Sequence, residues 1–279
     1  MIDGSHQRCA PPNACTADAA EYDAPEFLMD PTFYDRLAPY YHFLYTDWEA
    51  SIERQGAALA ALLDDLGIAP GAAVHDAACG IGTQTIALAR RGYRMTGSDL
   101  SPGALRRAQA ELESRGLSAT LTVGDMRDLD RIVAEPVHAV IACDNAVPHL
   151  LCDSEIRDAL RSCRDAVLPG GAVVLSLRDY DAVPRRSPDV HPHAVHHDGN
   201  RRVVPVQVWE WDQDHYDLRL YVTEEHATGA CSTHMLSTRY YAITINRLVE
   251  LAREAGLVQV ERRDGVLFQP VVVGLRGGR

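Results

Sequence analysis

The residues best suited to hold a small molecule form a short glycine-containing segment, His75-Asp76-Ala77-Ala78-Cys79-Gly80-Ile81-Gly82-Thr83. Small residues in such a turn let a ligand approach the backbone closely, so a bulky side chain at Gly80 or Gly82 would fill that space. A dinucleotide fingerprint needs a third glycine three residues after Gly82, where Thr85 stands. The segment therefore favours a nucleoside cofactor without a pyrophosphate, and tight packing of helix on strand is the alternative explanation for the two glycines.

Two acidic residues follow at positions that suit the same ligand. Asp99 comes 17 residues after Gly82 and closes an apolar, strand-like segment. A carboxylate at that place can accept hydrogen bonds from both ribose hydroxyls. Further on, Asp125 offers an acceptor for an adenine amino group, and Met126 offers an apolar side chain to pack on the ring.

In combination, the motifs D-A-A-C-G-I-G, S-D-L-S and G-D-M resemble the successive cofactor motifs of class I S-adenosylmethionine-dependent methyltransferases. The resemblance covers about residues 70–180. It implies a Rossmann-like fold, S-adenosylmethionine as the cofactor and S-adenosylhomocysteine as the product. The contacts expected from these motifs are Asp76, Ala78, Gly80, Gly82, Asp99, Leu100, Asp125 and Met126.

A narrower resemblance links residues 143–150 and 176–180 to the glycine N-methyltransferases and glycine/sarcosine N-methyltransferases. In that family the Asn and Arg of these segments hold the substrate carboxylate, which implies this role for Asn145 and Arg178. A guanidinium binds a carboxylate bidentately, so an anionic acceptor is expected. Two alternatives stay open: an ion pair of Arg178 with Asp179 or Asp181, and Asn145 as a plain turn residue.

The same resemblance supplies further site residues. Asp144 and His149, in the first of these segments, are assigned to the cofactor. The family's N-terminal aromatic segment implies Tyr34 and Tyr45 as walls of the site, although core packing would equally explain tyrosines there. The family's arginine that clamps the methionine carboxylate aligns with Ser51, so Arg54, one turn later, is the residue we expect to bind it.

The secondary structure that positions these residues is predicted to alternate between strands and helices. Apolar periodicity predicts a helix over 48–66, then strands at 72–78, 94–98, 119–123, 139–143 and 172–177 with helical stretches between them. Three alternating segments, 202–211, 218–225 and 231–241, predict an inserted antiparallel layer, and a final helix precedes strands at 258–262 and 271–275. The fold class is a doubly wound, seven-stranded α/β sheet with an inserted layer.

The expected organisation is a flexible arm over residues 1–30 and one methyltransferase domain over 31–279. Within that domain, residues 31–66 form a helical cover and 182–241 form a lid and the inserted strands. The Pro- and His-rich stretch Asp181–Arg201 has no period and is expected to be the lid. Its histidines match no fixed ligand spacing, so no metal is expected.

The amino-acid composition argues against several kinds of chemistry and binding partner. The 27 basic residues are all arginine, which excludes Schiff-base chemistry on lysine. A net charge of −12 without a basic stripe argues against nucleic acid and membrane partners. Seven cysteines at irregular positions and no signal-peptide pattern favour a reduced, cytoplasmic compartment.

The sequence thus predicts a methyltransferase acting on the nitrogen of a small carboxylate-bearing amine, either a glycine-like amino acid or a biosynthetic intermediate. O- or C-methylation of a larger metabolite is the alternative enzyme activity. A non-catalytic subunit with the same fold and a nicotinamide oxidoreductase are the other classes considered. The oligomeric state is left open.

Overall fold

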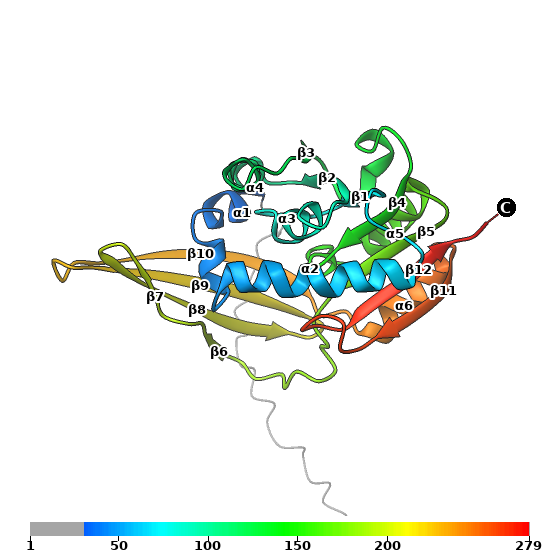
Figure 1. Cartoon of the computed structure of the whole chain (residues 1–279). Helices are drawn as coiled ribbons and strands as arrows, with labels where there is room; N and C mark the ends of the chain where they lie inside the picture. Colours follow the sequence, from blue (N-terminus) through cyan, green and yellow to red (C-terminus); the bar gives the residue numbers. More distant parts are fainter. Residues whose placement is uncertain (1–30, 279) are drawn as a thin grey trace, which may run out of the picture.

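The computed structural model describes residues 31–278 and shows an α/β architecture with two separate sheets (Figure 1). The larger sheet has seven strands in the order β11-β12-β5-β4-β1-β2-β3. These strands are β1 (Ala73–Asp76), β2 (Arg94–Asp99), β3 (Thr120–Val123), β4 (Val137–Ala142), β5 (Val167–Ser176), β11 (Leu257–Arg263) and β12 (Val271–Arg276). Strands β1 to β5 pair in parallel, whereas β12 runs antiparallel to both of its neighbours. The predicted doubly wound, seven-stranded sheet is confirmed.

Helices cover both faces of this sheet, because successive residues of its buried strands point to opposite sides. In β4, Val140 and Ala142 pack with α5 and α6, whereas Ala139 and Ile141 pack with α2 and α3. The helices are α1 (Pro31–Leu37), α2 (Trp48–Asp65), α3 (Thr83–Ala89), α4 (Pro102–Ser114), α5 (Asp153–Ala166) and α6 (Ile245–Glu254), with short 3-10 helices η1 (Tyr41–Leu44), η2 (Met126–Arg131) and η3 (Val147–His149).

The second sheet is antiparallel and is inserted between β5 and α6. Its strand order is β10-β9-β8-β6, with β7 also paired to β8. The strands are β6 (Asp189–Pro192), β7 (His196–Asp198), β8 (Arg201–Asp212), β9 (His215–His226) and β10 (Cys231–Tyr241). Figure 1 shows β8, β9 and β10 as long strands that project to one side of the larger sheet. The three predicted inserted strands are confirmed.

The stretch Asp181–Arg201 differs from its expected form as an aperiodic lid. Its strands β6 and β7 both pair with β8 in an antiparallel register, so about a third of the stretch belongs to the inserted sheet. Proline is tolerated there because β6 is an edge strand, where one side of the backbone needs no partner. In addition, His193 Nδ1 lies 3.0 Å from the carbonyl oxygen of Leu44, which anchors the stretch to η1.

A separate apolar cluster joins the inserted sheet to the N-terminal helices. Phe33 and Phe43 from α1 and η1 pack there with Trp209, Tyr216 and Tyr240 from the sheet. This packing holds α1 and η1 beside the inserted sheet and above the larger one. The expected arm over residues 1–30 lies outside the described residues, and the division of 31–279 into cover, lid and inserted strands stays a prediction. No helix in the described part of the chain is long and apolar enough to cross a membrane.

Candidate active site

The two glycines of the first motif have different surroundings. Both have left-handed backbones, with φ of +52° at Gly80 and +89° at Gly82. A Cβ added at Gly80 would meet nothing within 4 Å, because this residue borders an open pocket. A Cβ added at Gly82 would lie 3.2 Å from Ala108 Cβ on α4. Gly80 therefore leaves room for a ligand, whereas Gly82 permits close packing against the helix α4, rather than the packing of helix on strand that the sequence left as an alternative.

The loop at Gly80 is held in place by Asp99, which ends β2. One Asp99 oxygen accepts a hydrogen bond from Gly80 N at 2.8 Å, and the other accepts one from Ser101 N at 2.9 Å. Ser101 also caps α4, since its hydroxyl oxygen accepts from Ala104 N at 3.0 Å. Burial raises the pKa of Asp99. Each carboxylate oxygen keeps a second lone pair, so Asp99 can still accept from ribose hydroxyls.

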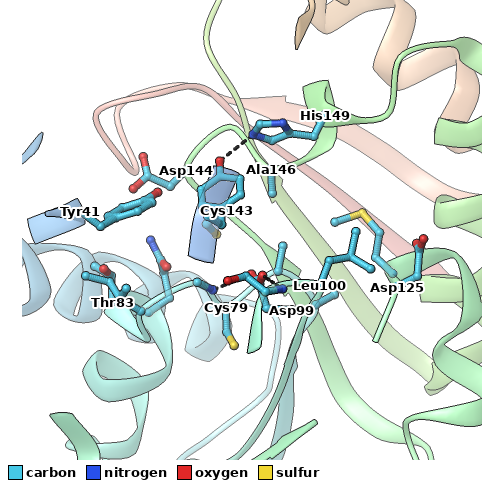
Figure 2. A pocket seen from close by; sticks show the side chains of 18 of the residues that line it. Tyr41, Cys79, Thr83, Asp99, Leu100, Asp125, Cys143, Asp144, Ala146 and His149 are labelled. Carbon is cyan, nitrogen blue, oxygen red and sulfur yellow. Dashed lines mark hydrogen bonds between the residues drawn. The ribbon is translucent and has the colours of Figure 1, made fainter. Parts of the chain in front are cut away.

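A pocket opens at the carboxyl ends of β1, β2, β3 and β4, where parallel α/β sheets bind ligands. In the view of Figure 2, Asp99 and Leu100 lie below the cavity, with Asp144 and His149 above it. We call this cavity the cofactor pocket. The predicted site residues that line it are Tyr34, Tyr45, Ala78, Gly80, Asp99, Leu100, Asp125, Met126, Asp144 and His149.

The charge of the cofactor pocket suits a cation. Asp99, Asp125 and Asp144 line it, and among residues 31–278 its lining includes no arginine. Burial raises the pKa of Asp144 as well as that of Asp99, so both carboxylates are poorly solvated and gain from a nearby positive charge. Asp125 is already paired with Arg127, at 2.6 Å. The pocket therefore fits a sulfonium nucleoside better than a pyrophosphate.

The turn after β4 places Asp144 between two cavities. Asp144 and Asn145 have φ values of 60° and 69°, a left-handed conformation that Asp and Asn tolerate better than most residues. Ser176 at the end of β5 holds this turn, because its hydroxyl accepts from Asp144 N at 2.8 Å and its carbonyl accepts from Asn145 N at 3.0 Å. The Tyr45 hydroxyl donates to the Asp144 carboxylate. The strain of this turn is a feature typical of functional sites.

A neutral histidine stands beside the tyrosines. His149 Nε2 and the Tyr34 hydroxyl lie 2.6 Å apart, and the ring of Tyr240 from β10 packs 4.2 Å from the imidazole. Burial lowers the pKa of His149 to about 3, so the ring carries no charge near neutral pH. It therefore does not repel a cationic ligand. The electron-rich faces of Tyr34, Tyr41 and Tyr45 add cation–π surface.

A second cavity adjoins the first, and we call it the acceptor pocket. It shares Tyr34, Tyr41, Tyr45 and Asp144 with the cofactor pocket and has a volume of about 520 Å³. Its remaining walls come from α2, the inserted sheet and the loop between β11 and β12. The lining residues outside the shared set are Leu44, Thr46, Asp47, Ser51, Arg54, Gln55, Ala58, Asn145, Arg178, Gln207, Tyr216, Leu218, Tyr240, Gly265, Val266, Leu267, Phe268 and Gln269.

Arg178 enters the acceptor pocket from the end of β5 without an acidic partner. Its guanidinium carbon lies 4.4 Å from the centre of the Trp209 ring, and its Nη1 is 3.5 Å from the Tyr216 hydroxyl. No carboxylate within residues 31–278 forms an ion pair with it. The alternative partner Asp179 pairs instead with Arg262, at 2.7 Å. The Arg178 charge is thus available to a ligand.

Asn145 contributes mainly by shaping the pocket. Its side-chain oxygen accepts from Arg178 N at 3.0 Å, and its side-chain nitrogen lies 2.8 Å from the Tyr180 hydroxyl. These bonds fix the backbone that carries Arg178. Asn145 lines the acceptor pocket, as does Arg178, so the structure brings these two predicted residues together.

Three of the expected cofactor contacts lie elsewhere. Asp76 is fully buried and accepts from the Thr85 hydroxyl at 2.8 Å, which makes it a support beneath the glycine loop. Burial raises the Asp76 pKa to about 7. Gly82 faces Ala108. Arg54 is exposed on α2 and lines the acceptor pocket, not the cofactor pocket.

Sequence reasoning missed several lining residues. Tyr41 borders both pockets, and only its aromatic character within the N-terminal segment signals this. Tyr216, Tyr240, Gln207 and Gln269 reach the acceptor pocket from the inserted sheet and the last loop. The first three lie in segments with the ordinary polar–apolar alternation of β-strands, and Gln269 lies in a loop, so no local motif identifies them as pocket residues. In the described residues, no group of three or more His, Cys, Asp and Glu side chains is arranged to hold a metal ion.

Comparisons with known proteins agree with this geometry. Residues 74–171 match the family model described as a methyltransferase domain. A glycine/sarcosine N-methyltransferase of Parasynechococcus marenigrum is 30% identical over 135 residues, which are 48% of this chain and 47% of that protein. A glycine N-methyltransferase of Oryctolagus cuniculus is 32% identical over 123 residues, 39% of this chain and 42% of that protein. The chain thus spans less than half the length of the curated relatives it matches.

Solved structures share the fold over nearly the whole chain. The S-adenosylmethionine-bound amino pentose methyltransferase CalS10 of Micromonospora echinaspora has a TM-score of 0.71 at 20% identity, covering 85% of this chain and 94% of that one. The sugar N-methyltransferase KedS8 of Streptoalloteichus has a TM-score of 0.69 at 18% identity, covering 98% and 100%. Residues 74–171 therefore match a methyltransferase domain, and the chain shares the fold of solved methyltransferases, among them one with S-adenosylmethionine bound.

Proposed function

We propose that the chain transfers a methyl group from S-adenosylmethionine to the nitrogen of a small amine that also bears a carboxylate. The observation that carries this proposal is Arg178, a cation that enters the acceptor pocket over Trp209 without an acidic partner in the described residues. A substrate carboxylate bound there forms an ion pair with the Arg178 guanidinium, with charge-assisted hydrogen bonds.

An acidic group at the boundary between the two pockets suits the amine. Asp144 borders both cavities and is held by the Tyr45 hydroxyl. Its carboxylate can accept a hydrogen bond from a neutral amine at the boundary where the cofactor pocket begins, which leaves the nitrogen lone pair free for the methyl group. Arg178 and Asp144 together orient an acceptor with a carboxylate at one end and an amine at the other.

The reaction needs alignment more than acid–base catalysis. S-adenosylmethionine, when bound, supplies a methyl group that a neutral amine can attack in line. The chain's residues exclude water and hold the two partners, since Tyr34, Tyr41 and Tyr45 form the common wall of the two pockets. The neutral His149 adds no charge that would oppose a cation at this wall.

The names of the curated relatives support nitrogen as the methylated atom, because two of those matched are glycine/sarcosine N-methyltransferases. The proposal is tested by incubating the protein with S-adenosylmethionine and paired amines that differ in one carboxylate, followed by mass spectrometry of the products. We expect methylation of the carboxylated member of each pair and little or none of the other. Equal methylation of both members would contradict the role of Arg178.

A larger acceptor methylated on oxygen or carbon is the second candidate. The acceptor pocket volume of about 520 Å³ favours it, since pockets for drug-sized ligands span roughly 300–1,000 Å³. A ubiquinone biosynthesis O-methyltransferase of Alkalilimnicola ehrlichii is 32% identical over 114 residues, covering 43% of that protein. Fragmentation of the methylated product distinguishes the candidates, because it locates the new methyl group on nitrogen, oxygen or carbon.

A further inference from the structure

The loop between β11 and β12 brings a polar side chain, that of Gln269, into the wall of the acceptor pocket, which Arg178 also lines. In the antiparallel pairing of β12 with β5, Val271 lies opposite Ser176. The pairing continues one step further, because Leu177 N donates to the carbonyl oxygen of Pro270 at 3.3 Å. Gln269 precedes Pro270 in the bend that leads into β12, and Arg178 follows Leu177 after β5, so the two residues leave this pairing at the same end. Both line the acceptor pocket.

The side chain of Gln269 is buried, and its oxygen has no hydrogen bond to the described part of the chain. Its exposed fraction is 7%, and it lines the acceptor pocket. Within residues 31–278, the side-chain oxygen Oε1 of Gln269 is buried without a hydrogen-bond partner. Seven other side-chain atoms in this part of the chain are also buried without partners, but none of their residues lines the acceptor pocket. A buried amide oxygen without a partner is costly, and a ligand group that bonds to it removes that cost.

The size of the acceptor pocket fits a ligand with more than an amine and a carboxylate. Its volume of about 520 Å³ is within the range of sites that enclose molecules much larger than glycine. The buried Gln269 Oε1 needs a hydrogen-bond donor on the ligand. A hydroxyl group both donates and accepts, so it can bond to either end of a side-chain amide.

We infer that Gln269 and Arg178 form one recognition subsite, in which Arg178 binds the acceptor carboxylate and Gln269 binds a hydroxyl group on the neighbouring carbon. The acceptor is then a hydroxylated amino acid rather than glycine. This inference rests on the proposed function, because it takes the acceptor to be a carboxylated amine. Gln269 acts in it as a specificity residue, and it does not border the cofactor pocket.

The test uses two amines that differ by one hydroxyl beside the carboxylate, isoserine and β-alanine. Calorimetry measures the binding of each to the full chain loaded with S-adenosylhomocysteine. We expect the wild type to bind isoserine about 2- to 10-fold more tightly, the value of one hydrogen bond. Gln269→Leu should bind the two equally, with its affinity for S-adenosylhomocysteine unchanged. The matched control is Gln109→Leu on the exposed side of α4, which should keep the preference.

A second variant tests whether Gln269 and Arg178 are neighbours. Gln269→Glu places a carboxylate in the pocket that Arg178 also lines, and the pair that forms should weaken the binding of both probes by about tenfold or more. The affinity for S-adenosylhomocysteine again reports whether the variant is folded. Unchanged binding of β-alanine by this variant would overturn the proposed adjacency.

The outcomes separate this inference from the proposed function. If the wild type binds isoserine and β-alanine equally, the hydroxyl subsite is overturned while the carboxylated amine stands. If neither probe binds, and isopropanolamine and propylamine, which lack the carboxylate, bind instead, the proposed function fails. A preference for isopropanolamine over propylamine that Gln269→Leu abolishes would then retain Gln269 as a hydroxyl-binding residue. If none of the four probes binds, both proposals are overturned.

Discussion

The two pockets of this protein are built from different kinds of sequence. The cofactor pocket is formed mainly by short loops that follow parallel strands, and its key residues Gly80 and Asp99 lie within 19 positions of each other and are hydrogen-bonded. The acceptor pocket is formed by α2, the inserted sheet, the last loop and the turns after β4 and β5, with residues from Tyr34 to Gln269. The first is a local motif on a common sheet, whereas the second depends on tertiary packing. A change at a residue that lines only one pocket should therefore leave ligand binding in the other intact.

The largest expected effect comes from the glycine loop. Gly80→Leu puts a side chain into the cofactor pocket, and we expect S-adenosylmethionine affinity to fall by about 100-fold or more, as calorimetry would measure. Gly82→Ala is the matched variant, since its backbone is also left-handed but its Cβ would meet Ala108. It should lower the free energy of unfolding by about 1–2 kcal/mol and keep most of the affinity. If Gly82→Ala lost affinity for S-adenosylmethionine while its free energy of unfolding stayed unchanged, this would contradict the assignment of Gly80 to ligand binding and Gly82 to packing.

The second largest effect is expected from a substitution in the acceptor pocket. Arg178→Met removes the proposed carboxylate ligand, and we expect the KM for the acceptor to rise about 10- to 100-fold. Affinity for S-adenosylmethionine should stay within about twofold, because Arg178 does not border the cofactor pocket. The control is Arg262→Met, which removes a nearby arginine that pairs with Asp179. A parallel loss of cofactor affinity in Arg178→Met would show that the pockets are not independent.

The pH dependence of stability should report the neutral, buried state of His149 in the cofactor pocket. Burial lowers the folded-state pKa of His149 to about 3, below its ordinary value of 6.5. Between these two values the unfolded chain binds the proton more readily, so stability falls as pH decreases, by about 1.4 kcal/mol per pH unit for this one residue. We expect His149→Gln to reduce the slope of unfolding free energy against pH between 6.5 and 4.5. Denaturant titrations at several pH values measure it, and an unchanged slope would show that His149 is not buried as a neutral ring.

The smallest effect is expected at Arg54. Its side chain is exposed and borders only the acceptor pocket, where solvent screens its charge. Arg54→Gln should therefore change the KM for the acceptor by about 2- to 5-fold and leave cofactor affinity unaffected. Steady-state kinetics with each substrate varied in turn measures both values. A tenfold loss of S-adenosylmethionine affinity would instead support Arg54 as the clamp of the methionine carboxylate.

The contrast between the pockets also explains how much of the molecule the sequence predicts. The strand and helix pattern is recognisable because apolar periodicity and the caps Ser101 and Gly82 are local signals. Gly80, Asp99 and Asp125 follow strand ends, and the order of parallel strands brings such ends to one edge. These features require no knowledge of distant contacts.

The remaining features depend on contacts between distant segments. The left-handed turn at Asp144 is fixed by Ser176 on another strand, and Tyr240 reaches His149 from the inserted sheet. Whether Gly82 faces a ligand or Ala108 depends on where α4 packs. Likewise, strands β6 and β7 form because β8 offers them an edge, although their own sequence has no strand period.

The most direct test of this account is calorimetric titration of S-adenosylmethionine into the wild-type chain and Gly80→Leu, each with S-adenosylhomocysteine as a second ligand. We predict one binding site of micromolar affinity for both ligands in the wild type and none that can be measured in Gly80→Leu. Absence of binding to the folded wild type, or equal binding to both proteins, would contradict the assignment of the glycine loop as the cofactor site.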